Sequence, residues 1–325
     1  MFVSFRSYHS QSKSFIKHFD FIKKSSHQKV NGVWKIKTNK SGPVLGITIH
    51  THGNEPSGLA VLSHFREKFP LEQHLKTGSV IFVLNNTRAT EMFLAAKNME
   101  DKKCSRFVDI NMNRLPNNTL ECSKNDARYE VRRAQELGII WKQFDIGLDI
   151  HSTTQESDGI IVNIGTLQPD LIRGFPITDI ITNIENIQVG KPAVSFYGNG
   201  SIPVMVIEAG SHESHQAFMR AINCTDALLK NLQMIEGKTK PSNRKYHEYY
   251  VGGALMFPDA SYALTKPFKS YTKFTAGEKI ATNGQCNIVA PFTGYSIFAP
   301  QGTTVKNLNE EVMFFLQPPK IITIE

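Results

Sequence analysis

Up to residue 237, short apolar runs alternate with longer segments in which apolar residues recur every three or four positions. The short runs predict buried strands, and the longer segments predict amphipathic helices. The predicted strands are 44–49, 78–84, 145–151, 159–164, 193–197 and 203–208. Because strands that alternate with helices usually form a parallel sheet with both faces covered, an α/β domain is expected here.

The first helix after a strand is predicted to begin at Pro56, since proline fits the first helical position. Its apolar residues Leu59, Leu62, Phe65 and Phe69 share one face. Further helices are predicted around 15–22 and at 126–144, 168–186 and 214–236. Residues 85–125 are largely polar and without period, which predicts a long irregular loop.

From about residue 238 the helical period disappears, and short β-prone runs are broken by glycines. This pattern predicts a small all-β domain. We therefore expect a basic N-terminal helical arm (1–27), an α/β domain (28–237) and a β-rich C-terminal domain (238–325).

The formal net charge of +8 equals the charge of residues 1–40 alone. That stretch holds nine Lys or Arg and one acid, and 9 − 1 = +8, so the remaining residues balance to zero and nucleic-acid binding is not expected. The basic helix in the arm either packs on its own domain, which we favour, or lies on an acidic membrane or partner surface.

The apolar runs are shorter than a membrane span, and no signal-peptide core follows the basic residues. The cysteines Cys104, Cys122, Cys224 and Cys286 have neither metal-site spacing nor the density of a disulfide scaffold. We therefore expect reduced thiols and a cytoplasmic protein.

Residues that can bind metals or transfer protons lie at the ends of three predicted strands. His52 and Glu55 follow strand 44–49, His151 ends strand 145–151, and Glu208 ends strand 203–208. Taken singly, these residues have ordinary structural explanations, such as a solvated loop, a core histidine or a helix cap. In a parallel sheet, however, they would meet at one edge, and two histidines with one glutamate form the ligand set of a catalytic zinc. Glu208 would then be free to transfer protons.

Four segments resemble signatures of the aspartoacylase/succinylglutamate desuccinylase family, whose members are relatives of the zinc carboxypeptidases. They are His-Gly-Asn-Glu at 52–55, Asp-Ile-His-Ser-Thr at 149–153, Ile-Glu-Ala-Gly at 207–210 and the stretch 104–114, and they follow the family's order and spacing. The resemblance implies a carboxypeptidase-like mixed sheet with helices on both faces and a smaller all-β C-terminal domain.

The resemblance also implies residue roles. One Zn²⁺ per chain would be bound by His52, Glu55 and His151, with Glu208 as general base and acid. The remaining implied residues are Arg106, which would polarise the scissile carbonyl, and Asn113 and Arg114, which would hold a substrate carboxylate.

Aspartoacylase has a further arginine shortly before its catalytic glutamate, whereas residues 193–207 of this chain contain none. An acidic substrate side chain is therefore not expected. We predict a zinc-dependent amide hydrolase that acts on an N-acyl amino acid with a free carboxylate. A metallocarboxypeptidase acting on short peptides and a non-catalytic binding protein on the same fold stay open as alternatives, as does a homo-oligomer.

Overall fold

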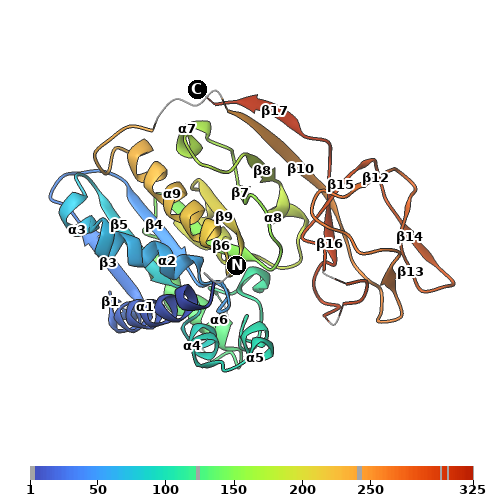
Figure 1. Cartoon of the computed structure of the whole chain (residues 1–325), viewed down its shortest axis with the longest axis horizontal. Helices are drawn as coiled ribbons and strands as arrows, with labels where there is room; N and C mark the ends of the chain where they lie inside the picture. The colour runs from blue at the N-terminus through green and yellow to red at the C-terminus, as the bar shows by residue number, and fades with distance from the viewer. Residues whose placement is uncertain (1–3, 122–124, 240–243, 301, 306, 325) are drawn as a thin grey trace.

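The computed structural model describes residues 4–121, 125–239, 244–300, 302–305 and 307–324, and its centre is a mixed sheet in the order β8-β7-β9-β6-β4-β5-β3 (Figure 1). These strands are β3 (Val33–Lys37), β4 (Val44–Ile49), β5 (Ser79–Leu84), β6 (Ile146–Thr153), β7 (Ile160–Ile164), β8 (Asp179–Thr182) and β9 (Val204–Ser211).

Strands β5, β4, β6 and β9 are neighbours and run parallel, as the sequence predicts. Strand β7 runs antiparallel to β9, and β3 runs antiparallel to β5, so the sheet is mixed. Because β4, β6 and β9 are parallel neighbours, their carboxyl ends lie at one edge of the sheet. That edge is where ligands bind in folds of this kind.

Helices cover both faces of the sheet (Figure 1). Along β9, Met205 and Ile207 enter one core while Val204 and Val206 enter the other, because successive side chains of a strand point to opposite faces. The first core is covered by α1 (Ser4–Lys24), α2 (Ser57–Ser63) and α9 (His215–Asn231). The second is covered by α6 (Tyr129–Trp141) and the 3₁₀ segment η3 (Ala193–Gly200).

Two sequence predictions of secondary structure are wrong. Residues 193–197, predicted as a strand, belong to η3, and Gly198 and Asn199 there have φ of 51° and 61°. The predicted helix 168–186 is instead α7 (Pro169–Ile172), β8 and α8 (Ile184–Ile187). Gly174, with φ of 76°, and Pro176 break the helical pattern, and the β-branched residues that follow favour a strand.

The predicted irregular loop 85–125 also contains helices: α4 (Thr87–Ala95), α5 (Met99–Cys104) and the 3₁₀ turn η2 (Met112–Arg114). Asn86 caps α4 by accepting a hydrogen bond from the backbone of Ala89, and Asn98 caps α5 in the same way. These asparagines are N-cap signals that a search for apolar periodicity does not detect. Cys122 lies outside the described residues.

The C-terminal part is β-rich, as predicted (Figure 1). Its strands are β10 (Lys245–Leu255), β11 (Ala263–Leu264), β12 (Lys273–Phe274), β13 (Lys279–Thr282), β14 (Asn287–Val289), β15 (Gly294–Ile297), β16 (Met313–Leu316) and β17 (Lys320–Thr323). Strand β10 pairs with β8 of the central sheet as well as with β16 and β17. We propose to keep residue 238 as the boundary, with β10 joining the two parts through this shared pairing.

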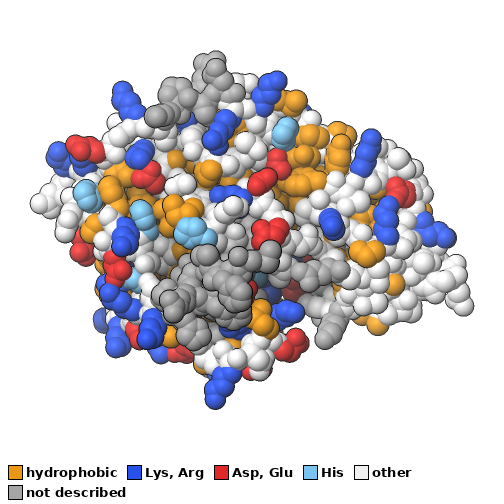
Figure 2. Space-filling view, in the orientation of Figure 1, with side chains coloured by type: hydrophobic (Ala, Val, Ile, Leu, Met, Phe, Trp, Pro, Cys, Tyr) orange, Lys and Arg blue, Asp and Glu red, His pale blue; other side chains and the backbone are white. Residues whose placement is uncertain are grey.

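The basic helix α1 packs on its own domain. Phe19 and Ile22 are buried in the core that α2 and α9 also line. Lys and Arg side chains gather on the surface over α1 (Figure 2). Lys17 of this helix pairs with Glu67, and Lys23 pairs with Glu91 of α4. Among the described residues, no helix has both the length and the apolar character that crossing a bilayer requires.

Replacing Ile22 by alanine is expected to lower the free energy of unfolding by about 2–5 kcal/mol, because it leaves a cavity at a fully buried position. Urea unfolding followed by circular dichroism measures this. Ile16 in the same helix is 44% exposed, so Ile16→Ala serves as the control and should cost under about 1 kcal/mol. Equal, small losses in both variants would show that α1 does not contribute to the core.

Shorter elements complete the chain. They are the hairpin β1 (Ser26–His27) with β2 (Val30–Asn31), the π-helical turn η1 (His64–Lys68) that continues α2, and α3 (Leu71–His74). Leu59, Leu62 and Phe65 are fully buried along α2 and η1, as their spacing predicts, whereas Phe69 lies beyond the end of η1.

Candidate active site

Four of the predicted site residues meet at the carboxyl ends of β4, β6 and β9. His52 and Glu55 lie in the loop between β4 and α2, and His151 is near the end of β6. Glu208 on β9 is paired in register with His151 on β6. Gly53 allows the loop to pack closely, because a Cβ at this position would lie 2.3 Å from the backbone of Ala89 and 2.4 Å from that of Ser105.

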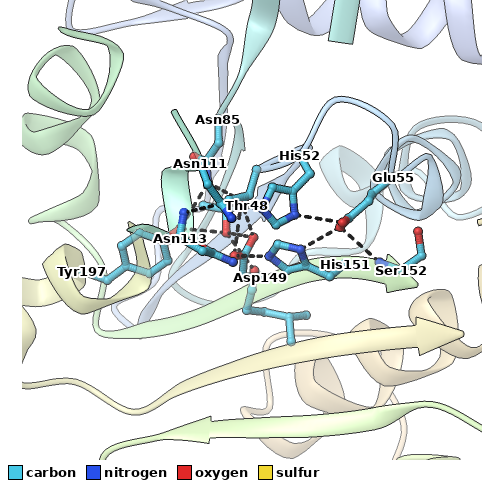
Figure 3. A network of polar contacts seen from close by, with 12 residues as sticks. Thr48, His52, Glu55, Asn85, Asn111, Asn113, Asp149, His151, Ser152 and Tyr197 are labelled. Atoms are coloured by element: carbon cyan, nitrogen blue, oxygen red, sulfur yellow. Dashed lines mark hydrogen bonds and ion pairs between the residues drawn. The ribbon is translucent and has the colours of Figure 1, made fainter. Parts of the chain in front are cut away.

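His52, Glu55 and His151 form a compact, buried cluster (Figure 3). Each offers one ligand atom, and the three atoms lie within 4.8 Å of one another. Nδ1 of His52 is 2.8 Å from one carboxylate oxygen of Glu55, and Nδ1 of His151 is 2.7 Å from the other. Two imidazole nitrogens and one carboxylate that converge in this way match the donor set that zinc takes.

The far nitrogen of each imidazole already has an oxygen acceptor. Nε2 of His151 is 2.8 Å from Oδ2 of Asp149, and Nε2 of His52 is 2.8 Å from Oδ1 of Asn111. When Nε2–H donates to these oxygens, the lone pair of Nδ1 points into the cluster. Metal-binding histidines are oriented by this kind of outer hydrogen bond, so the residues present fit a bound metal.

Sequence reasoning assigned no role to Asp149 and Asn111. Asp149 is fully buried, and it accepts hydrogen bonds from the hydroxyls of Thr48 and Thr51 as well as facing His151 (Figure 3). Since residues i and i+2 of a strand point to the same face, the pair Asp149 and His151 was a detectable signal. The contact between Asn111 and His52 spans 59 positions and depends on a loop.

That loop is held by a buried carboxylate. Glu130 on α6 is fully buried and accepts backbone hydrogen bonds from Val108, Asp109 and Ile110 at 2.6–3.1 Å. This fixes the segment that carries Arg106 and Asn111. Arg106 is 41% exposed, and its guanidinium donates to Glu55 at 2.8 Å, so the predicted arginine does lie beside the cluster.

Two pockets flank the cluster. The first has a volume of about 220 Å³, and the second has a volume of about 180 Å³. Arg106, Glu208 and Phe298 line both pockets. The predicted acid-base residue and the predicted carbonyl-binding arginine therefore lie where the two pockets meet.

The first pocket is lined by both apolar and polar or charged side chains. Its apolar walls are Val162, Ile164, Ile184, Val194, Val206 and Phe314. Asn113 and Arg114 line it together with Glu310 and Glu311. Oδ1 of Asn113 is buried without a hydrogen-bond partner among the described residues. The structure thus brings both residues of the predicted carboxylate clamp to the pocket.

Arg114 is itself held by an acid from the C-terminal part. Nε and Nη2 of Arg114 donate to one carboxylate oxygen of Glu311 at 2.9 and 2.6 Å, and the other oxygen accepts from the backbone of Val189. The Glu311 side chain is 1% exposed. This pair fixes the guanidinium at the pocket wall, and no local sequence pattern connects two residues 197 positions apart.

Burial and charge separate the pKa values of the site. Burial lowers the pKa of His52 to about 4, which keeps its imidazole neutral. Burial opposes the charged form of His151 as well, but the carboxylates of Asp149 and Glu55 outweigh it and raise the pKa of His151. Burial raises the pKa of Glu208 to about 8 in the metal-free protein, and a divalent cation in the cluster would act in the opposite direction.

Three further histidines lie near the site. His50 is fully buried with a left-handed φ of 52°, and its Nδ1 lies 3.2 Å from the carbonyl of Gly53. His212 follows β9 and faces Ser152, whereas His215 is exposed at the start of α9. Among them only His212 lines one of the two pockets.

Comparison with known proteins supports the family that the sequence resembles. Residues 41–181 match the Succinylglutamate desuccinylase/Aspartoacylase catalytic domain. This match supports the aspartoacylase/succinylglutamate desuccinylase family for the chain. The matched range includes His52, Glu55, Arg106 and His151, and the resemblance seen in the sequence is confirmed.

Among curated proteins, the chain is 33% identical over 118 residues to a human N-acyl-aromatic-L-amino acid amidohydrolase (carboxylate-forming). The matched stretch covers 34% of this chain and 33% of that protein. The corresponding protein of Xenopus tropicalis is 30% identical over 110 residues, or 32% of each chain. The matches therefore span about a third of the length of these relatives.

Solved structures extend the likeness of fold to most of the chain. Succinylglutamate desuccinylase from Vibrio cholerae has a TM-score of 0.67 at 14% identity and covers 90% of this chain and 88% of its own. Murine aminoacylase 3 has a TM-score of 0.57 at 17% identity, and the match covers 88% of this chain and 98% of the aminoacylase chain. The predicted fold class, a mixed α/β sheet with a β-rich C-terminal part, is confirmed.

Proposed function

We propose that this protein is a zinc-dependent hydrolase that removes an acyl group from an N-acyl amino acid. The observation that carries the proposal is the His52–Glu55–His151 cluster between two pockets that share Arg106 and Glu208. The names of the curated relatives, which are amidohydrolases of N-acyl aromatic amino acids, support the same class of reaction.

The two pockets suit the two halves of such a substrate. In the first pocket, Asn113 and Arg114 would bind the α-carboxylate, and the apolar walls would pack against the amino-acid side chain. The acyl half would enter the second pocket, which places the amide bond at the junction. With apolar walls and no arginine in residues 193–207, we propose an apolar, including aromatic, side chain.

At the junction the chain supplies three actions. His52, Glu55 and His151 would hold one zinc ion, whose Lewis acidity lowers the pKa of water to about 7. Arg106 would donate hydrogen bonds to the carbonyl oxygen as negative charge develops there. The Glu208 carboxylate would take a proton from the attacking water and deliver it to the leaving nitrogen.

The alternatives differ in what they require of the second pocket. A metallocarboxypeptidase would use the same residues but needs space for a peptide chain, whereas this pocket holds about 180 Å³ and has Phe298 and Ala299 in its wall. A non-catalytic binding protein would need neither Glu208 nor Arg106 at the junction. We also propose a cytoplasmic setting, which the unpaired thiols of Cys104, Cys224 and Cys286 support.

Screening the zinc-loaded protein against N-acyl amino acids and dipeptides tests the proposal. We expect release of free amino acid from N-acyl derivatives with apolar or aromatic side chains, and much slower release from dipeptides and from N-acetylaspartate. Cleavage of dipeptides alone would favour the carboxypeptidase. Binding without turnover of any compound would favour the binding protein.

The substrate's free α-carboxylate should matter. Converting it to an amide is expected to lower kcat/KM by about tenfold or more, because the change removes a charge-assisted contact with Arg114 worth about 1.5–3 kcal/mol. The matched control is exchange of the side chain between phenylalanine and leucine, which should have a smaller effect. Equal rates for acid and amide would show that Arg114 does not bind the carboxylate.

A further inference from the structure

The imidazole of His212 is anchored at one nitrogen and unpaired at the other. Nδ1 lies 2.8 Å from the hydroxyl oxygen of Ser152, and the backbone N–H of His212 donates to the carbonyl of Thr153 at 2.9 Å. Nε2 is buried, and it has no hydrogen-bond partner among the described residues. A buried polar atom without a partner is uncommon, because burial removes its water without replacing it.

His212 lines the second pocket. Hydroxyl and amide side chains make up much of this pocket wall: Ser152, Thr153, Thr154, Gln155, Ser157 and Ser270. The first pocket, by contrast, has aliphatic and aromatic side chains in about half of its wall, beside polar and charged ones. The two halves of the substrate would therefore meet different environments.

We propose that His212 determines specificity for the acyl group by forming a hydrogen bond through Nε2 with a hydroxyl on the acyl chain. This inference rests on the proposed deacylase function, and it names the acyl class as short hydroxyacyl groups. A hydroxyl suits either tautomer of a neutral imidazole, because it both donates and accepts hydrogen bonds.

Two observations favour a hydroxyl over a charged acyl group. Burial lowers the pKa of His212, so its imidazole is neutral near pH 7. Arg106, which also lines the second pocket, donates to Glu55 and would face the scissile carbonyl. A carboxylate on the acyl chain would thus have no cation of its own among the described residues of this pocket.

Matched ligand pairs test the inference by binding. N-hydroxyacetyl-L-phenylalanine is compared with N-propanoyl-L-phenylalanine, since the two differ by a hydroxyl in place of a methyl group. Calorimetry on the full, zinc-loaded Glu208→Gln protein measures affinity without turnover. We expect the hydroxyacyl compound to bind roughly fivefold to tenfold more tightly, as one net hydrogen bond allows.

The same pair is then measured with a second substitution added. His212→Leu should remove most of the preference, whereas His212→Gln, which keeps a hydrogen-bonding end, should restore part of it. His215→Leu is the matched control: this exposed histidine lines neither pocket, and its variant should retain the preference. Zinc content and thermal unfolding show whether each variant is folded.

The outcomes distinguish failure of this inference from failure of the proposed deacylase function. Equal affinities within the pair, or a preference that His212→Leu leaves unchanged, would overturn the role of His212 while the deacylase function stands. If the enzyme with Glu208 intact neither binds nor cleaves any N-acyl amino acid, both the role of His212 and the deacylase function would be overturned.

Discussion

Replacing Glu208 by glutamine should lower kcat by about 100-fold to 10,000-fold, the contribution of a positioned general acid-base group. Glutamine has nearly the same shape as glutamate but cannot take a proton from water. Glu208 is not part of the convergent His52–Glu55–His151 cluster, so zinc should stay bound. Steady-state kinetics together with elemental analysis of the same sample measure both effects.

The matched control is Glu156→Gln, which changes an exposed carboxylate that lines neither pocket. It should retain both zinc and activity. If Glu208→Gln lost its zinc, Glu208 would be a metal ligand and Glu55 would need another role. If it kept full activity, the proton would have to be transferred by another group.

The ligand cluster could be predicted because each of its members is tied to a strand end. His52 with Glu55 follows β4, His151 ends β6, and the alternation of strands with helices implied that these ends meet. The structure brings the cluster residues together as that reasoning expected. The order of the strands, their parallel direction and the position of these residues at the strand ends were enough to predict the cluster.

The residues that orient the cluster were harder to find, because their contacts cross loops or domains. Asn111 reaches His52 only because Glu130 holds the intervening backbone. Glu311 comes from the far end of the chain to fix Arg114. Such contacts depend on tertiary packing, which neither periodicity nor local motifs encode.

The secondary-structure errors have a similar origin. Segment 193–197 is apolar enough for a strand, but left-handed residues at Gly198 and Asn199 follow it, and it packs as a 3₁₀ turn against α6 instead. In 168–186, β-branched residues at helix-like spacing concealed a short strand. Apolar runs this short are ambiguous between helix and strand until their neighbours are known.

Removing either histidine of the cluster should remove the metal and, with it, activity. His52→Ala and His151→Ala each delete one of three protein ligands, and the two that remain cannot complete the set of a catalytic zinc site. Elemental analysis after dialysis should find near-stoichiometric zinc in the unsubstituted protein and far less in both variants. Turnover should fall to background in parallel.

The control for this prediction is His215→Ala, which removes an exposed histidine outside both pockets and should change neither zinc content nor rate. Asp149→Asn adds a finer test. Asparagine keeps an oxygen near Nε2 of His151 but loses the charge, and outer-shell changes of this kind typically weaken metal binding by about 10–100-fold. Full zinc in both histidine-to-alanine variants would refute the site. If His151→Ala loses its zinc but Asp149→Asn keeps it, the Asp149 carboxylate does not support His151 as a ligand.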